Sequence, residues 1–306
     1  MCGNRNALRG LKEMFSFKGN ALLFKILSLI FVLSLFLAYF AINQNIVLVG
    51  VKEDSVKLTG SDLPEWVVKC RRTWTKRGFN ITEEFYVNEY VMLSVERARN
   101  SSLSLAIVKV EGYCELCYPN VGITKEERLQ PERIEAFNKL KKYVNTLWSK
   151  YGHDPRLSGI TVNAYVVPRS ALTVDEFLRL IEELNLTSKV KDIYYTVYDT
   201  EGNYVMGGGR RIRKGCDFLS EVTNMVKAAH HMLNVMNKSN YTTKLYIGSF
   251  VIESNVSELA KLANFKEKLA LVYVPLDIII QLRQEGYNVT EVRYTSILKA
   301  IPELEL

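Results

Sequence analysis

The sequence predicts an α/β fold, in which a mixed sheet carries flanking helices and is preceded by one transmembrane helix. Three observations lead to this prediction. Short apolar runs typical of buried strands alternate with longer stretches whose apolar residues recur every three or four positions. Hydrophobic residues make up 48% and charged residues 24% of the 306 residues, a composition typical of folded globular proteins. Residues 21–42 hold an apolar run long enough to cross a bilayer, for which about 17–25 residues are needed.

The apolar run is expected to be an uncleaved membrane anchor. From Ile26 to Ile42 it is interrupted only by two serines, and the segment before it carries several Lys and Arg but a single acid, Glu13. This charge bias keeps the N-terminus in the cytoplasm and places the remainder outside. A cleaved signal peptide is the alternative, but its apolar region should be shorter and should end in small residues. Here the run ends in Phe-Leu-Ala-Tyr-Phe-Ala-Ile-Asn, which does not fit that pattern.

Potential glycosylation sites support the same orientation. Chance predicts about two or three N-x-S/T triplets in a chain of this composition. The sequence holds seven, and all of them lie after the apolar run. The triplets begin at Asn80, Asn100, Asn185, Asn237, Asn240, Asn255 and Asn288. We expect a glycoprotein with its bulk outside the cell; a surface merely rich in Asn, Ser and Thr is the other interpretation.

The first elements of the outer part lead to a pair of cysteines. Thr82 is expected to cap a helix that continues to Arg99, because Val87, Val91 and Val95 recur at helical spacing. Residues 103–111 form an apolar run typical of a buried strand, and Cys114 and Cys117 follow it directly. Open α/β sheets place their chemistry at such strand ends.

The later elements alternate between helices and strands. Pro131 opens an amphipathic helix that Gly152 ends, and Thr173 with Glu176 forms a capping box for the next helix. Residues 199–203 indicate a hairpin, which Gly207–Gly209 are expected to end. Further strands are expected at 159–167, 193–198, 204–206, 244–252, 269–274 and 289–295, and further helices at 218–236, 255–262 and 277–285.

The helix, the strand with Cys114-Glu-Leu-Cys117, the hairpin Tyr194–Gly207 and the helix after it resemble the thioredoxin fold. The resemblance covers about half of the chain, roughly residues 82–236. It lacks the family's proline before the hairpin, where Val190, Lys191 and Asp192 stand, and has Tyr113 in place of the usual Trp. Residues 239–306 would form a C-terminal α/β unit. Because 159–198 and the segment after 244 both read strand, capped helix, strand, a duplication of βα units is an alternative.

The resemblance implies a division of the chain and roles for its cysteines. The chain would comprise a cytoplasmic tail 1–20, the anchor 21–42, a juxtamembrane segment 43–81, the thioredoxin-like domain 82–238 and the unit 239–306. Cys114 would be the attacking thiol and Cys117 the resolving one. Four outer cysteines allow three pairings; if Cys114 pairs with Cys117, Cys70 and Cys216 would form a structural disulfide.

Other chemistries find less support in the sequence. The net charge of +7 is spread along the chain, which favours a solvated basic surface over a nucleic-acid site, and no cofactor motif is evident. A metal site could use Cys114, Cys117, Cys216 and one of His153, His230 or His231, but the spacing matches no zinc pattern. The glycine-rich stretch 207–215 could hold a phosphate, although a basic loop is the simpler interpretation.

Two functions are therefore expected. The first is a membrane-anchored, extracytoplasmic thiol–disulfide oxidoreductase that uses Cys114 and Cys117 on the thiols of other proteins. The second is a non-catalytic glycosylated ectodomain that uses the same scaffold for binding or assembly.

Overall fold

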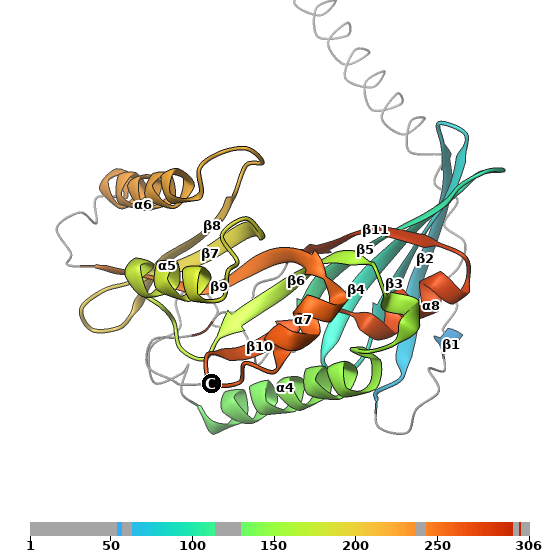
Figure 1. The fold of residues 1–306 in the computed structure, drawn as a ribbon, viewed down its shortest axis with the longest axis horizontal. Helices are drawn as coiled ribbons and strands as arrows, with labels where there is room; N and C mark the ends of the chain where they lie inside the picture. Colours follow the sequence, from blue (N-terminus) through green and yellow to red (C-terminus); the bar gives the residue numbers. More distant parts are fainter. Residues whose placement is uncertain (1–53, 57–62, 114–129, 237–242, 296–299, 301–306) are drawn as a thin grey trace, which may run out of the picture. The chain divides into compact units, whose positions relative to one another are not determined.

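The computed structural model of the chain describes residues 54–56, 63–113, 130–236, 243–295 and 300, all within one compact unit, Leu48–Leu306 (Figure 1). In this described part, two sheets and five α-helices form a mixed α/β fold, which confirms the predicted class. The segments 21–42 and Cys114–Cys117 lie outside the described residues. Among the helices of the described part, none is long and apolar enough to cross a membrane.

The first sheet, called sheet 1, has the strand order β1-β2-β3-β4-β5-β11. Its neighbours are antiparallel except β5 and β11, which run parallel. The strands are β1 (Asp54–Val56), β2 (Trp66–Lys76), β3 (Phe79–Val87), β4 (Val91–Arg99), β5 (Ser104–Tyr113) and β11 (Asn288–Tyr294). The last strand of the chain thus lies beside β5, far from it in the sequence.

The helix expected over 82–99 is wrong: these residues form the hairpin of β3 and β4. Asn88 makes the turn, since its Oδ1 accepts hydrogen bonds from the backbone N–H groups of Tyr90 and Val91 at 2.9 and 2.8 Å. The valines that suggested a helix also fit a strand, because Val91, Leu93 and Val95 alternate toward the core. The many β-branched and aromatic residues here favour strands.

The second sheet, called sheet 2, has the antiparallel order β10-β6-β9-β7-β8. Two strand–helix–strand units interleave in it, so that β9 separates β6 from β7 and β6 separates β10 from β9. This is the connectivity of the split β-α-β, or ferredoxin-like, motif, extended by β8 and α6. The elements are β6 (Thr161–Pro168), α5 (Val174–Glu183), β7 (Val190–Tyr198), β8 (Tyr204–Arg211), α6 (Phe218–Val235), β9 (Lys244–Asn255), α7 (Val256–Ala263) and β10 (Leu269–Tyr273).

Local signals define the helices of both units. The capping box of Thr173 and Glu176 begins α5, as predicted, and Asn255 caps α7 by accepting the Glu258 N–H at 2.8 Å. The expected hairpin is also present, but Gly207–Gly209 lie within β8 and do not end it. The stretch 207–215 therefore is not the glycine loop that a phosphate site would need.

The expected division into 82–238 and 239–306 does not follow the sheets. Strand β9 comes from the second stretch and lies between β6 and β7 of the first, so both stretches build sheet 2. Residue 82 lies inside β3. The strand before the Cys pair belongs to sheet 1, whereas the β7–β8 hairpin belongs to sheet 2.

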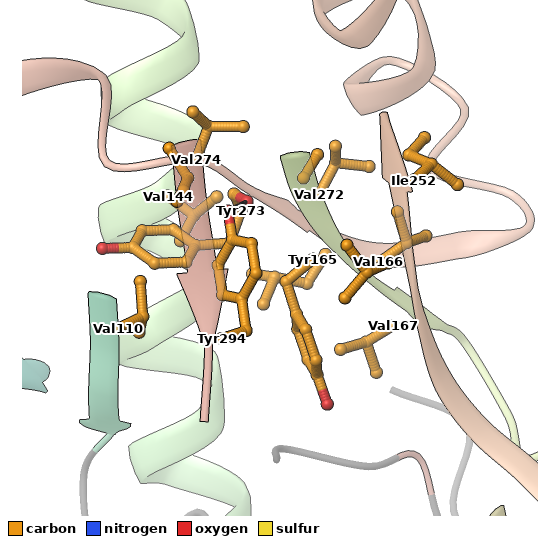
Figure 2. Packing of buried hydrophobic residues seen from close by; sticks show 14 of the residues in the cluster. Val110, Val144, Tyr165, Val166, Val167, Ile252, Val272, Tyr273, Val274 and Tyr294 are labelled. Atoms are coloured by element: carbon orange, nitrogen blue, oxygen red, sulfur yellow. Dashed lines mark hydrogen bonds between the residues drawn. The ribbon is translucent and has the colours of Figure 1, made fainter. Parts of the chain in front are cut away.

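Helices α4 (Pro131–Tyr151) and α8 (Leu276–Gln284) pack against the sheets, and a short 3-10 helix, η2 (Pro155–Leu157), follows α4. Tyr294 of β11 connects the two sheets, because its hydroxyl donates toward the backbone oxygens of Asn163 and Tyr273 at 2.9 and 2.8 Å. Figure 2 shows its ring among buried valines and beside Tyr165, with ring centroids 5.4 Å apart.

Candidate functional site

The predicted redox pair lies directly beyond the described end of β5. Strand β5 is confirmed and ends at Tyr113, one residue before Cys114. It is an interior strand of sheet 1, between β4 and β11. Cys114 and Cys117 themselves lie outside the described residues.

Cys70 and Cys216 are both free thiols, and no disulfide joins them in the described part of the chain. Cys70 is half-buried in β2 of sheet 1. Cys216 is exposed in the turn before α6, where its N–H donates to the Arg213 carbonyl at 3.1 Å. The expected structural disulfide is therefore not formed in this structure.

The glycosylation triplets in the described residues differ in what the Asn side chain does. Asn80, Asn185 and Asn288 are exposed. Asn100 and Asn255 are half-buried, and their side-chain oxygens accept backbone hydrogen bonds in a turn and in a helix cap. Asn237 and Asn240 lie outside the described residues. A sugar on Asn255 would have to leave the cap of α7 intact.

No group of three or more His, Cys, Asp or Glu residues that could hold a metal ion occurs in the part of the chain that the structure describes. His230 and His231, considered as ligands from the sequence, are both exposed on α6.

The cluster of charged residues between sheet 1 and α8 is the most developed polar site of the described residues. It borders a cavity of about 370 Å³. The cavity is lined by Val68, Arg71, Thr82, Glu84, Tyr86, Arg97, Gln281, Glu285 and Tyr287. Strands β2, β3 and β4 contribute one wall, and α8 with Glu285 and Tyr287 after it contributes the other.

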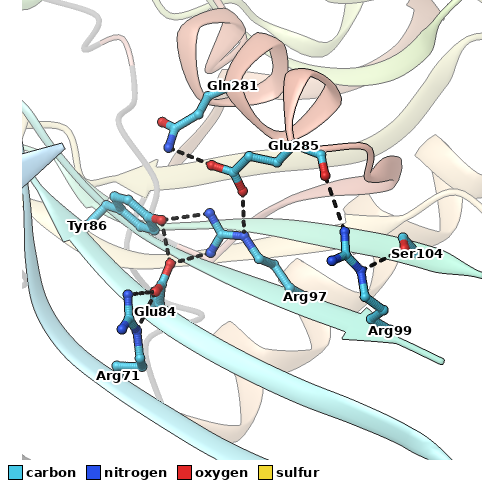
Figure 3. A network of polar contacts seen from close by, with 8 residues as sticks. All are labelled: Arg71, Glu84, Tyr86, Arg97, Arg99, Ser104, Gln281 and Glu285. Carbon is cyan, nitrogen blue, oxygen red and sulfur yellow. Dashed lines mark hydrogen bonds and ion pairs between the residues drawn. The ribbon is translucent and has the colours of Figure 1, made fainter. Parts of the chain in front are cut away.

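Glu84 is the centre of this cluster (Figure 3). One carboxylate oxygen accepts from Arg71 Nε at 2.6 Å, and the other accepts from the Tyr86 hydroxyl at 2.5 Å and forms an ion pair with Arg97. Burial by itself raises the pKa of the Glu84 carboxyl, but the Tyr86 hydrogen bond and the charges of Arg97 and Arg71 outweigh burial and lower that pKa overall. Glu84 is therefore ionised although it is buried.

Arg97 connects the sheet to the helix. Its Nη2 donates to the Tyr86 hydroxyl oxygen at 2.8 Å, and its Nε lies 3.3 Å from Oε2 of Glu285. Gln281 holds Glu285 in place by donating from Nε2 to Oε1 at 2.9 Å. The guanidinium carbon of Arg97 also lies 5.8 Å from the ring centroid of Tyr287, a distance typical of cation–π contacts.

Arg99 adds a third guanidinium at the border of the cluster. It donates to the Glu285 carbonyl at 3.2 Å, and its guanidinium carbon lies 4.7 Å from the Tyr287 ring centroid. Three arginines thus accompany two carboxylates. The side chain of Arg71 is 45% exposed, against 10% for Arg97, so Arg71 presents its guanidinium to solvent while Glu84 fixes its position. A guanidinium held in this way can bind an anionic oxygen in a defined geometry.

Two larger cavities are less suited to recognition. One of about 540 Å³ has Tyr90 stacked on Tyr143 with centroids 5.1 Å apart, and its Lys139 is already paired with Glu135 at 2.7 Å. Another of about 510 Å³ lies where β11 meets sheet 2. Four of its charged residues pair with one another, Arg211 with Asp192 at 3.4 Å and Lys191 with Glu253.

This cluster was not predicted from the sequence, because Glu84, Tyr86 and Arg97 were expected to lie in a helix. As strands, β3 and β4 place Glu84 and Arg97 at buried positions on the same face as Tyr86 and Val95, with Glu84 opposite Val95. A buried acid and a buried base on neighbouring strands are the signal that would have indicated a pair, once the Asn88 turn was recognised.

Comparison with family models, curated proteins and solved structures finds no match for this chain.

Proposed function

We propose that this chain is a membrane-anchored, extracytoplasmic binding protein whose α/β domain recognises a carboxylate-bearing ligand at Arg71. The observation that carries the proposal is the cluster around Glu84, where Arg71, Arg97 and Arg99 bring one more positive charge than Glu84 and Glu285 neutralise. Sheet 1 and helix α8, which Arg97 and Glu285 connect, would hold this cluster rigid.

Rigidity matters for such a site because ordering a long side chain costs binding energy. Arg71 is already held by two contacts of 2.6 Å to Glu84, so it loses little freedom when a ligand binds. The remaining N–H groups of a guanidinium suit a carboxylate, which accepts two parallel hydrogen bonds. Tyr287, stacked on Arg99, provides an apolar surface beside the charge.

The test uses the full-length chain in detergent and a fluorescent oligoglutamate peptide as the probe. Arg71→Gln should weaken binding by about tenfold, because a hydrogen bond to a charged group contributes about 1.5–3 kcal/mol. Arg72→Gln is the matched control: it removes the same charge from the next residue of β2, where Arg72 lies over the Phe85 ring, 5.4 Å from its centroid. Equal losses in both variants would indicate unspecific attraction and contradict the proposal.

The anchor and its orientation are part of the same proposal. They are supported by the apolar run 21–42, the basic residues before it and the triplets after it. Protease added to intact cells should remove the outer domain and leave a small N-terminal fragment. Protection of residues 80–306 from the protease would contradict this orientation.

A thioredoxin-like redox function is a second candidate, and the position of β5 favours it. The strand is interior to sheet 1 and ends one residue before Cys114, which is where a reactive pair would be displayed. In this candidate, the Cys114 thiolate attacks a disulfide of a partner protein, releases one partner sulfur as a thiolate and forms a mixed disulfide. Cys117 then attacks Cys114, forming the Cys114–Cys117 disulfide and releasing the reduced partner.

Replacing Cys117 with Ser should trap the mixed disulfide, and replacing Cys114 should abolish it. The trapped species is detected on non-reducing gels of the full-length chain. If Cys117→Ser traps nothing and the chain neither reduces nor oxidises a test dithiol, the redox candidate fails and the binding protein remains.

A further inference from the structure

We propose that two copies of this chain pair along β8, antiparallel, so that sheet 2 continues from one copy into the other. The proposal rests on the edge strand β8 and on helix α6, and not on the arginine cluster of sheet 1. A twofold axis perpendicular to the sheet would relate the two copies, as is usual for a self-complementary interface.

Strand β8 is an edge that lacks the usual protection against pairing. Within the described residues, β7 is its partner and its outer side has none. From Tyr204 to Gly209 it carries no charged residue and no proline, the features by which edge strands normally avoid pairing. The Tyr204 phenol contacts the backbone of Gly207, so an incoming strand would displace that side chain.

The opposite edge of sheet 2 differs. Strand β10 is covered by α4, whose Trp148 donates its indole N–H to the Val272 carbonyl at 2.5 Å. The outer edge of β11 in sheet 1 is likewise engaged, since the Asn163 side chain donates to the Val292 carbonyl at 2.9 Å. Comparison of these edges identifies β8 as a long edge that the described residues leave open.

The glycines of β8 are needed for packing within one copy, and they carry no side chains along the outer edge of the strand. A Cβ on Gly208 would lie 2.5 Å from the Tyr195 hydroxyl oxygen, and one on Gly209 would lie 2.8 Å from the Tyr194 ring. The two tyrosine rings therefore occupy the space above and below the strand. The glycines themselves present no side chain to a second strand, and the Tyr204 phenol at Gly207 is the side chain that would have to move.

The occupant is a second copy because the charges along β8 complement themselves. The turn before the strand carries Asp199 and Glu201, whereas the strand ends in Arg210 and Arg211. Antiparallel pairing centred on Met206 brings Arg211, at the end of β8, to the Asp199–Asn203 turn of the other copy, which carries Glu201. Arg211 is available for this, since its side chain is 77% exposed and its contact with Asp192 is 3.4 Å long.

Helix α6 provides an apolar surface next to the same edge. It packs on β8 and begins beside α5, where the Phe218 and Phe177 ring centroids lie 6.2 Å apart. At the C-terminal end of this helix Met232, Val235 and Met236 are 47%, 63% and 41% exposed, and they occupy neighbouring positions on the helix surface. A twofold axis perpendicular to sheet 2 sets the two α6 helices on the same face, where these side chains would cover one another.

Charge reversal on the full-length chain in detergent tests the proposal, with mass measured at several protein concentrations. The chain should dimerise, and Glu201→Arg or Arg211→Glu should each raise the dimer dissociation constant by tenfold or more, because symmetry counts each change twice. The double variant Glu201→Arg with Arg211→Glu should return to within about twofold of the original value. Lys214→Glu, the same charge change beyond the strand, should have little effect.

A monomeric chain, or a dimer that Arg211→Glu leaves unchanged, would overturn the proposal. So would a double variant that remains monomeric while circular dichroism shows it folded. Crosslinking separates β8 pairing from other contacts: Met206→Cys should form a disulfide between copies, because residues at the centre of a twofold strand pair face one another, whereas Thr200→Cys should not. Loss of anion binding in Arg71→Gln has no bearing on these outcomes.

Discussion

Trp66 donates its indole N–H to the carboxylate of Asp277 at 2.8 Å, and both side chains are buried. Trp66 begins β2 and Asp277 lies in the first turn of α8, so this hydrogen bond attaches the helix to sheet 1. The Tyr143 hydroxyl of α4 lies 3.4 Å from the same oxygen. A carboxyl group that is 1% exposed therefore connects three elements.

The stability of the fold should decrease with rising pH through Asp277. Burial raises the pKa of its carboxyl above the usual value of 3.8, although hydrogen bonds from Trp66 and the Ile278 N–H lower it. A raised pKa in the folded state means that the stabilisation present below the usual pKa is lost as pH rises through the raised one.

Asp277→Asn keeps an acceptor for Trp66 and does not ionise. Urea unfolding at several pH values should show that, from about pH 4 upward, the free energy of unfolding of the variant increases relative to that of the wild type. If the difference between the two free energies of unfolding stays constant with pH, the raised pKa of Asp277 is contradicted.

Removing Arg97 should destabilise the protein strongly. Arg97→Met leaves the Glu84 carboxylate buried without its main ion-pair partner, which typically costs about 3–5 kcal/mol. Adding Glu84→Leu should recover most of this loss, because the uncompensated charge is then removed as well. Arg72→Met, an exposed control on β2, should change the free energy of unfolding by about 0.5 kcal/mol or less. Chemical denaturation measures all four proteins; a double variant no better than Arg97→Met would show that packing and not charge is responsible.

Gly208 should not tolerate a side chain. The Cβ of Gly208→Ala would meet the Tyr195 ring at 2.5–2.9 Å, an overlap that costs about 1–3 kcal/mol in a packed region. In a Tyr195→Ala background the same substitution should cost much less, so that a double-mutant cycle isolates the contact. Gly112→Ala is the control, because its Cβ would lie 3.7 Å from Met92 at an ordinary contact distance. Similar costs for Gly208→Ala in both backgrounds would rule out the clash.

At Asn255, helix capping can be separated from glycosylation. Asn255→Ala removes both the triplet and the oxygen that caps α7, and should cost about 1 kcal/mol of stability. Ser257→Ala removes the triplet but leaves the cap. Mass spectrometry should report the same glycan loss for both variants, whereas thermal unfolding after enzymatic deglycosylation should separate them. Equal stability of the two deglycosylated variants would contradict the capping role.

Elements with a strong local signal were predicted well. Pro131 and Gly152 delimit α4, and Thr173 and Glu176 cap α5. Asp199 makes the β7–β8 turn by accepting hydrogen bonds from the backbone N–H groups of Glu201 and Asn203. Each of these signals lies within a few residues of the element that it begins or ends. The hairpin of β3 and β4 was missed because Val87, Val91 and Val95 fit both periods, and the Asn88 turn was not recognised.

The sequence by itself determined the class of the fold, its helices and most of its strands, because periodicity and capping act between neighbouring residues. Only the tertiary structure decided that β5 and the β7–β8 hairpin belong to different sheets and that β11 pairs with β5. It also brought Trp66 to Asp277, 211 residues apart, and Arg97 to Glu285, 188 residues apart. Such contacts depend on which apolar faces bury one another across the whole chain, and the local spacing of residues carries no information about that choice.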